Sequence, residues 1–337
     1  MKLVLIGAGS IGGMLSVLLA EKGIPLDVVV HGEEKAKLIR QEGFHLTGVR
    51  GEHCAKLNTF GSVSELEDLY DVCIIATKYQ QMPELAKEMI PHLKPDALVL
   101  AMQNGNCMDQ LAAAVGVDRT VGCMISFSAT LKSANEAEVT AVDKLILGMA
   151  DGTVPDRLKA LAEVLNKAVP TRVTDHLLPE LYAKIIFNSC INAISSVTYT
   201  NVGHMLSTPK ARQVILGIIR EGVAVTEANG IEVAPYNVLP PFQFFANHRG
   251  PLADALLGRF LQLALSVAAG KVRPSTLQSL EKGLPTEIDI MNGHLAALGT
   301  EHGIPTPVNT SLTRIIKEIE HGDRSLDAQN IQLVELK

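Results

Sequence analysis

Residues 2–22, with the sequence KLVLIGAGSIGGMLSVLLAEK, join a short apolar segment to a glycine-rich turn and then to a longer segment rich in Ala and Leu. The first segment, Lys2 to Ile6, has the composition of a buried strand, and the last has that of a helix. Gly23 ends the helix, and a second apolar segment, Leu26 to Val30, follows it. This order of strand, turn, helix and strand predicts a βαβ unit within an α/β fold, a doubly wound parallel sheet.

The turn carries the pattern G-x-G-x-x-G, with its glycines at Gly7, Gly9 and Gly12. Between a strand and a helix, this pattern is typical of a Rossmann-type dinucleotide-binding domain. The first glycine permits the tight turn, the second lets the backbone approach a pyrophosphate, and the third lets helix and strand pack closely. The loop is therefore expected to bind the cofactor through Gly7, Gly9, Ser10, Ile11 and Gly12. The alternative is a glycine-rich turn in an α/β protein that binds no nucleotide.

The end of the second strand usually distinguishes the two nicotinamide cofactors. An acidic residue there binds the ribose hydroxyls of NAD, and an arginine meets the 2′-phosphate of NADP. Residues 30–35 read VHGEEK and offer neither in the usual place. His31 and Lys35 are candidates for a phosphate, although a neutral histidine holds an anion poorly at pH 7. This reading favours NADP (NADPH) and leaves NAD open.

Two further apolar strands end in polar residues. Asp71 to Ala76 runs into Thr-Lys-Tyr-Gln, and Ala97 to Ala101 runs into Met-Gln-Asn-Gly-Asn. Ligands bind at the carboxyl ends of strands in open parallel sheets, so Lys78 and Asn104 are expected near the glycine loop. A solvated lysine and a turn asparagine are the plainer alternatives.

The alternation of strands and helices stops after Thr174. Before it we expect strands at Gly122 to Ser128, Lys144 to Gly148 and Thr171 to Val173, with a helix from Pro155 to Ala168. After it the chain reads as helices: a stretch from Leu181, then Lys210 to Asn229, an apolar region up to Ala269, Thr286 to Gly303, and Pro307 to His321. The change predicts a dinucleotide-binding domain at 1–174, a helical substrate domain at 175–321 and a loose polar tail at 322–337.

The helical half contains a polar stripe in an apolar stretch, LYAKIIFNSCINAISSVTYTNVG, residues 181–203. Lys184, Asn188 and Asn192 are spaced four residues apart, so on a helix they share one face. Burying such groups without partners costs several kcal/mol, so the stripe must meet something. Internal partners, a carboxylate and nearby backbone, are the common solution. The alternative is a row of donors that faces a substrate in a cleft between the domains.

Two other segments allow both a capping and a functional reading. Residues 285–293, PTEIDIMNG, look like a helix start with Pro and Thr near the cap and acids in the first turn. Glu287 is instead a candidate for the acid beside Lys184. Ser275, which follows Arg-Pro, is either a capping residue or a group that holds a carboxylate.

Composition excludes several other classes. The 337 residues are 47% hydrophobic and 20% charged, as in a compact globular protein. The net charge of −6 argues against nucleic acid as a partner. No long apolar run is free of charges and turn formers, and no signal peptide precedes the first strand, so we expect no membrane association and a cytoplasmic location. The five cysteines have no C-x-x-C spacing and the histidines no metal-binding pattern, which predicts reduced cysteines and no metal site.

Taken together, the motifs resemble the ketopantoate reductase family, which makes pantoate from 2-dehydropantoate with NADPH. The resemblance covers nearly the whole chain, through the segments GAGSIG, ATKYQ, QNGN, LYAKIIFNSCINAISSVT, PSTLQS, PTEIDIMNG and HGIPTPVNT. It implies catalytic roles for Lys184 and Glu287, the latter also beside the cofactor. It implies substrate binding by Asn188, Asn192, Ser275 and Asn104, and cofactor contacts by Lys78, Asn104 and His31.

The sequence also departs from the family pattern. His31 replaces the usual arginine after the second strand, Val272 replaces an asparagine before Ser275, and the region from Glu232 to Lys271 is longer. The resemblance implies reduction of a 2-oxo acid to a 2-hydroxy acid, most directly 2-dehydropantoate to pantoate in pantothenate biosynthesis. The alternatives are a related enzyme for another 2-oxo acid, with NAD as cofactor, and a dinucleotide-binding sensor without turnover. A homodimer stays open.

Overall fold

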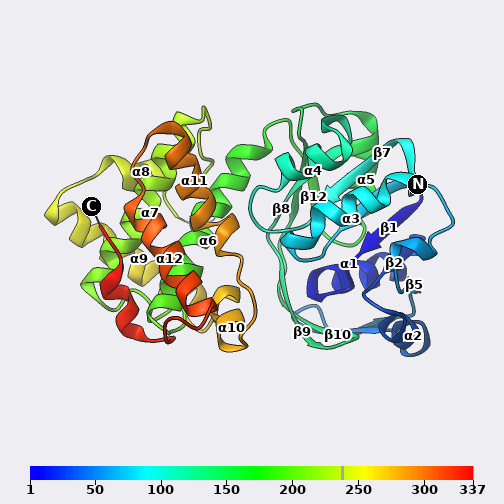
Figure 1. Cartoon of the computed structure of the whole chain (residues 1–337), viewed down its shortest axis with the longest axis horizontal. Coiled ribbons are helices and arrows are strands. Elements are labelled where there is room, and N and C mark those ends of the chain that lie inside the picture. The colour runs from blue at the N-terminus through cyan, green and yellow to red at the C-terminus, as the bar shows by residue number, and fades with distance from the viewer. Residues whose placement is uncertain (237–238, 337) are drawn as a thin grey trace. The chain divides into compact units, whose positions relative to one another are not determined.

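The computed structural model describes residues 1–236 and 239–336 and divides the chain into two compact units, Met1–Leu177 and Leu178–Lys337 (Figure 1). The first unit is mixed α/β and the second is helical, which confirms the predicted fold class.

The main sheet of the first unit has eight strands in the order β12-β11-β8-β7-β6-β1-β2-β5. Its strands are β1 (Leu3–Ile6), β2 (Leu26–Val29), β5 (Asn58–Phe60), β6 (Tyr70–Ile75), β7 (Leu93–Ala101), β8 (Thr120–Ile125), β11 (Leu145–Met149) and β12 (Thr171–Val173). Neighbouring strands are parallel except for β8 and β11, which are antiparallel. The central strands are almost wholly apolar because both faces of the sheet are buried.

Helices cover the two faces of this sheet: α1 (Ser10–Glu21), α2 (Glu33–Glu42), α3 (Met82–Met89), α4 (Met108–Val115) and α5 (Asp156–Asn166). Side chains alternate along β1, so that Leu3 and Leu5 pack in the core with α1 and α5, whereas Val4 and Ile6 pack in the core with α3 and α4. The two cores fix the position of the loop that follows β1.

A second, four-stranded sheet was not expected from the sequence. Its order is β4-β3-β10-β9, with β3 at Phe44–Gly48, β4 at His53–Ala55, β9 at Ser128–Ser133 and β10 at Glu136–Ala141. The single strand predicted over Gly122 to Ser128 is therefore wrong in extent, because β8 ends at Ile125 and Ser128 begins β9. Phe44 of this sheet packs against Gly13 of α1, where any side chain would overlap the phenyl ring.

The second unit consists of α6 (Leu177–Val197), α7 (Pro209–Ala228), α8 (Phe242–Asn247), α9 (Pro251–Ala269), α10 (Ser275–Glu281), α11 (Asn292–His302) and α12 (Pro307–Glu320), with short 3₁₀ turns η5 (Ile288–Ile290) and η6 (Ala328–Leu333). The helix expected over Thr286 to Gly303 begins only at Asn292. The carboxylate of Glu320 accepts hydrogen bonds from the backbone N and the Oγ1 of Thr286, at 3.1 and 2.7 Å, and holds this segment out of the helix.

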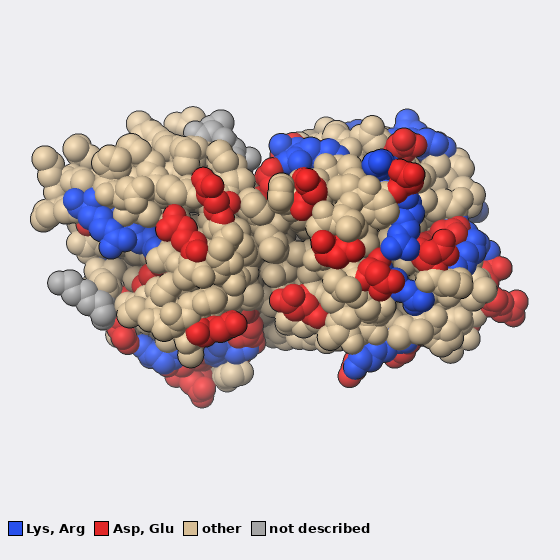
Figure 2. Space-filling view, turned by 90° about the horizontal axis from the view of Figure 1, so that it is seen from above, with Lys and Arg blue, Asp and Glu red and all other residues tan. Residues whose placement is uncertain are grey.

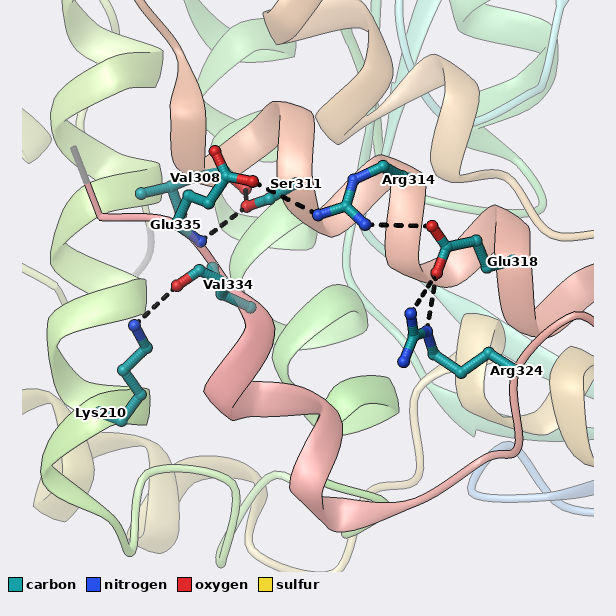
Figure 3. Close-up of polar contacts among 8 residues, drawn as sticks. All are labelled: Lys210, Val308, Ser311, Arg314, Glu318, Arg324, Val334 and Glu335. Carbon is teal, nitrogen blue, oxygen red and sulfur yellow. Dashed lines mark hydrogen bonds and ion pairs between the residues drawn. The ribbon is translucent and has the colours of Figure 1, made fainter.

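The segment expected as a loose tail is instead packed against the helices (Figure 3). Lys210 Nζ donates to the carbonyl of Val334 at 2.6 Å, and the backbone N of Glu335 donates to Ser311 Oγ at 3.1 Å. Ile331 and Val334 are 3% and 2% exposed. The largely polar sequence concealed this packing because two buried apolar side chains, Ile331 and Val334, together with backbone hydrogen bonds, are enough to anchor the segment.

Candidate active site

The glycine loop of the first unit has one position that is open and two that are crowded. Gly7 has φ +101°, and its N–H donates to Val29 O at 2.8 Å. A Cβ at Gly12 would overlap the carbonyl oxygen of Gly7, so the start of α1 packs directly on the turn. A Cβ at Gly9 would have no atom within 4 Å. Gly7 and Gly12 thus serve the fold, whereas Gly9 leaves space for a ligand to approach the backbone.

The first turn of α1 faces the loop with its N-terminal end. Gly9 is the N-cap residue and provides no side-chain cap, while Ser10 and Ile11 are partly exposed. The amides and the dipole at such a helix end favour an anion. This donor set, together with the open space at Gly9, fits the pyrophosphate of a nicotinamide dinucleotide.

A lysine lies against the loop. Lys35 of α2 donates from Nζ to the carbonyl oxygen of Ala8 at 2.8 Å, and partial burial lowers the pKa of its ammonium group. His31, the residue at the family's arginine position, is exposed after β2. Lys35 therefore places its amino group beside the predicted phosphate-binding turn, and His31 lies at the exposed end of β2.

The carboxyl ends of β6 and β7 adjoin the same loop, since a Cβ at Gly7 would contact Thr77. Sequence reasoning missed the residue that joins these ends. Gln103 is buried and donates from Nε2 to the carbonyls of Ile75 at 3.0 Å and Thr77 at 3.1 Å. Lys78, which directly follows Thr77, is exposed, and Asn104, which directly follows Gln103, is partly exposed. The structure thus brings Lys78 and Asn104 to the edge that carries the glycine loop.

In the second unit, the polar stripe lies on α6 as expected, but its members differ in burial. Lys184 and Asn188 are partly exposed. Asn192 is only 5% exposed, and its Nδ2 donates to Met291 Sδ at 3.3 Å. The described contact of Asn192 is internal, which agrees with the alternative of structural partners for this residue better than with substrate binding.

A network of buried asparagine amides and one carboxylate holds α6 in place, and no local sequence pattern predicts it. Asn292 donates from Nδ2 to Ser189 O of α6 at 3.4 Å and to Asn309 Oδ1 at 3.0 Å. Glu221 of α7 accepts from Asn309 Nδ2 at 2.7 Å and from the backbone N–H groups of Val308 and Asn309, each at 2.9 Å. Burial raises the pKa of Glu221, an effect that these hydrogen bonds partly offset. Asn292 and Asn309 both lie in segments predicted to be helical, and these two amides were the signal in the sequence that could have indicated the network.

The remaining predicted site residues lie on short segments. Ser275 is exposed at the first residue of α10, where Pro274 is the N-cap and no side chain caps the helix. The capping role considered for Ser275 is therefore wrong. Glu287 is partly buried directly before η5, and Asp289 forms an ion pair with Lys317 at 3.0 Å. Glu287 is thus the N-cap residue of η5 and Asp289 lies within η5, so both precede α11 and neither lies in the first turn of that helix.

The five cysteines are all free, with Cys54 exposed and the others buried.

Positive and negative side chains are interspersed over the face of the first unit seen at the right of Figure 2.

Two family models match the chain. The model described as "Ketopantoate reductase PanE/ApbA" matches residues 3–152, and that described as "Ketopantoate reductase PanE/ApbA C terminal" matches residues 176–320. The 2-dehydropantoate 2-reductase of Aquifex aeolicus is 27% identical over 327 residues, covering 95% of this chain and 97% of the relative. That of Archaeoglobus fulgidus is 24% identical over 321 residues, covering 94% and 97%.

Solved structures share the fold over almost the full length. A PanE/ApbA family ketopantoate reductase from Ralstonia eutropha has a TM-score of 0.81 and 23% identity, covering 96% of this chain and 99% of that one. A ternary structure of D-mandelate dehydrogenase with NADH and anilino(oxo)acetate has a TM-score of 0.80 and 20% identity, with the same coverage. Because the family models match both units, this chain belongs to the ketopantoate reductase family and is a dinucleotide-binding oxidoreductase that acts on CH–OH groups.

Proposed function

We propose that this enzyme reduces a 2-oxo acid to a 2-hydroxy acid with NADPH, and that 2-dehydropantoate, the substrate named in its curated relatives, is its substrate in pantothenate biosynthesis. The observation that carries the proposal is the partly exposed Lys184 on a helix that is otherwise mostly buried. The other unit of the chain fits a nicotinamide dinucleotide. A lysine at this accessible position is therefore suited to donate a proton during carbonyl reduction.

In the proposed reaction, a reduced nicotinamide held at the glycine loop would supply the hydride for the carbonyl carbon of the substrate. Lys184 donates a proton from Nζ to the carbonyl oxygen, so the ketone gains a hydride and a proton and becomes an alcohol. General acid catalysis of this kind contributes about a hundred- to ten-thousandfold to the rate. We assign Glu287 as the acid that acts together with Lys184, Asn188 as the group that orients the substrate, and the Ser275 hydroxyl as the group that holds its carboxylate.

The cofactor preference rests on the positive charge beside the glycine loop. The contact of Lys35 with Ala8 supports NADPH, because a lysine near the turn is available to the 2′-phosphate. The NADH in the related D-mandelate dehydrogenase structure supports the alternative. Lys35→Met is expected to weaken NADPH binding by at least about tenfold and NADH binding much less, since only NADPH carries the extra phosphate. Equal losses for both cofactors would contradict this assignment.

The decisive assay crosses both cofactors with a panel of 2-oxo acids that includes 2-dehydropantoate. Dominant activity on 2-dehydropantoate with NADPH is expected. Lys184→Ala should lower kcat by at least about a hundredfold while the Kd for NADPH stays within about twofold. Lys282→Ala, an exposed lysine of the same unit, is the matched control. Near-normal turnover of Lys184→Ala would refute the role of this lysine.

A second candidate function is reduction of another 2-oxo acid. The structural likeness to D-mandelate dehydrogenase, the presence of Val272 before Ser275 and the long region from Glu232 to Lys271 favour this candidate. Higher kcat/KM on an aryl or branched 2-oxo acid than on 2-dehydropantoate would select it. Cofactor binding with no oxidation by any acid of the panel would select the non-catalytic sensor. A cytoplasmic location also remains a prediction.

A further inference from the structure

Helix α9 exposes a continuous row of large apolar side chains to solvent. Leu252, Leu256, Phe260, Leu263 and Val267 are 75%, 63%, 45%, 68% and 80% exposed. At about 100° per residue, all five lie within about 80° of arc and extend over about 22 Å of helix. We call these five residues the α9 stripe. Single exposed apolar residues are normal, but a contiguous row of this size marks an interaction surface.

The opposite face of α9 is fixed to the rest of its unit. Leu261 and Leu265 are 0% and 3% exposed, and Gly258 lies so close to Arg212 of α7 that a Cβ there would be 2.8 Å from the Arg212 Cβ. Ser266 Oγ donates to Gly203 O at 2.8 Å. The helix is therefore held in one rotation about its axis, and the stripe faces outward.

The spacing of the stripe is nearly the same when read in either direction. From the N-terminal end the steps are four, four, three and four residues, and from the C-terminal end they are four, three, four and four. A two-fold axis near Phe260, perpendicular to the helix, therefore places Leu252 opposite Val267 and Leu256 opposite Leu263 of a second copy. A surface that is complementary to itself under a two-fold axis is the requirement for an isologous dimer.

The sequence steps also suit helix packing. Leu256, Phe260, Leu263 and Val267 follow one another at four, three and four residues, which is the alternation that keeps two helices in contact along a seam. Phe260 is held from below by Phe245, with ring centroids 6.4 Å apart, so its orientation is set before a partner arrives. Phe244 of α8, 42% exposed, lies beside Phe245 and extends the apolar area.

From this geometry we infer that the α9 stripe is the interface of a homodimer in which two α9 helices pack antiparallel about a two-fold axis near Phe260. The helix is also long and apolar enough, by length and composition, to cross a membrane over Pro251–Ala268, and only 22% of that window is buried. Spanning a bilayer would, however, pull Leu261 and Leu265 out of the protein interior in which they are packed. A chain with net charge −6 is repelled by an anionic lipid surface. A second copy has the same net charge, but it also presents the same stripe, whose spacing matches this one under the two-fold axis.

The first test is the mass of the full-length protein in solution, measured by light scattering and sedimentation up to about 100 μM. The wild type is expected to be a dimer. Leu256→Glu combined with Leu263→Glu should raise the dissociation constant at least about a hundredfold, because four buried apolar contacts per dimer become charged. Leu284→Glu, at a leucine of the same unit that is 52% exposed and lies outside the stripe, should leave the dimer intact. A monomeric wild type, or a dimer that survives the double change, overturns the inference.

The second test reads the arrangement directly and does not depend on the stability of those variants. In a Cys54→Ser background, which removes the exposed cysteine, Phe260→Cys should form an intermolecular disulfide under mild oxidation because it lies near the two-fold axis. Leu252→Cys should not, because its counterpart in an antiparallel pair lies about 22 Å away along the helix. Cross-linking through Leu252→Cys instead, or binding of the monomer to neutral phosphatidylcholine vesicles, would overturn the antiparallel dimer.

Discussion

Replacing Gly9 by alanine tests whether the open position in the glycine loop is the cofactor site. The Cβ would enter space that contains no protein atom within 4 Å, and the backbone of Gly9, at φ −83° and ψ −156°, is accessible to alanine. The substitution removes backbone freedom from the unfolded chain, worth about 0.4–1 kcal/mol of stabilisation. Alanine is a poorer N-cap than glycine, which costs a few tenths of a kcal/mol or more. The two effects nearly cancel, so stability should change by less than about 1 kcal/mol.

Cofactor binding should respond quite differently. The methyl group would keep a pyrophosphate away from the amides at the start of α1, and each hydrogen bond to a charged group is worth about 1.5–3 kcal/mol. Loss of one such bond raises the Kd at least about tenfold, since 1.4 kcal/mol corresponds to a factor of ten. NADPH and NADH titrations, followed by nicotinamide fluorescence, measure this change, and urea unfolding measures stability.

Gly12→Ala is the matched control, because a Cβ there would overlap the carbonyl of Gly7 and the backbone has no room to move. Overpacking of this kind costs about 1–3 kcal/mol, so this variant should lose stability as well as affinity. Gly9→Ala that unfolds at the wild-type urea concentration and binds both cofactors with wild-type affinity would refute the assignment of this loop to the pyrophosphate.

Three further predictions concern the second unit. Glu221→Ala should destabilise the protein by about 1–3 kcal/mol in urea unfolding, because two buried N–H groups of α12 lose their acceptor, whereas the exposed Glu227→Ala should change stability by less than about 0.5 kcal/mol. Deletion of residues 328–337 should lower the urea midpoint, since it removes buried side chains and the acceptor of Lys210, while a truly loose tail could be removed without effect. The hydrogen bond from Arg324, together with that from Arg314, holds the pKa of Glu318 below its ordinary value of 4.5, so the stability it contributes is present above that pH and is lost as the pH falls through the lower, folded-state pKa. Arg324→Met should therefore reduce the dependence of the urea midpoint on pH between about 6 and 3.5, and an unchanged pH dependence would count against this pairing.

The sequence predicted the features that depend on neighbouring residues. The glycine loop between β1 and α1 needs a strand, a tight turn and a helix within about thirty residues, and the chain provides all three. The central strands could be recognised because they are buried on both faces and each contains a continuous apolar run. The position of Lys184 and Asn188 on one face of α6 follows from helical periodicity alone.

The features that the sequence did not reveal depend on residues far apart in the chain. The sheet formed by β3, β4, β9 and β10 was missed because its strands are short and partly exposed, so they lack a continuous apolar signal. The start of α11 was misplaced because Glu320 binds Thr286, a partner 34 residues away. No local pattern contains this information.

Periodicity and turn chemistry act over a few residues, so the change from α/β to helical content, the glycine-rich turn after β1 and the polar stripe of α6 can be predicted from the chain alone. Which members of these patterns are accessible depends on tertiary packing. It buries Asn192 against Met291 and leaves Lys184 partly exposed, and it directs the apolar stripe of α9 outward. Burial depends on which elements pack together, and that packing is a property of the whole chain.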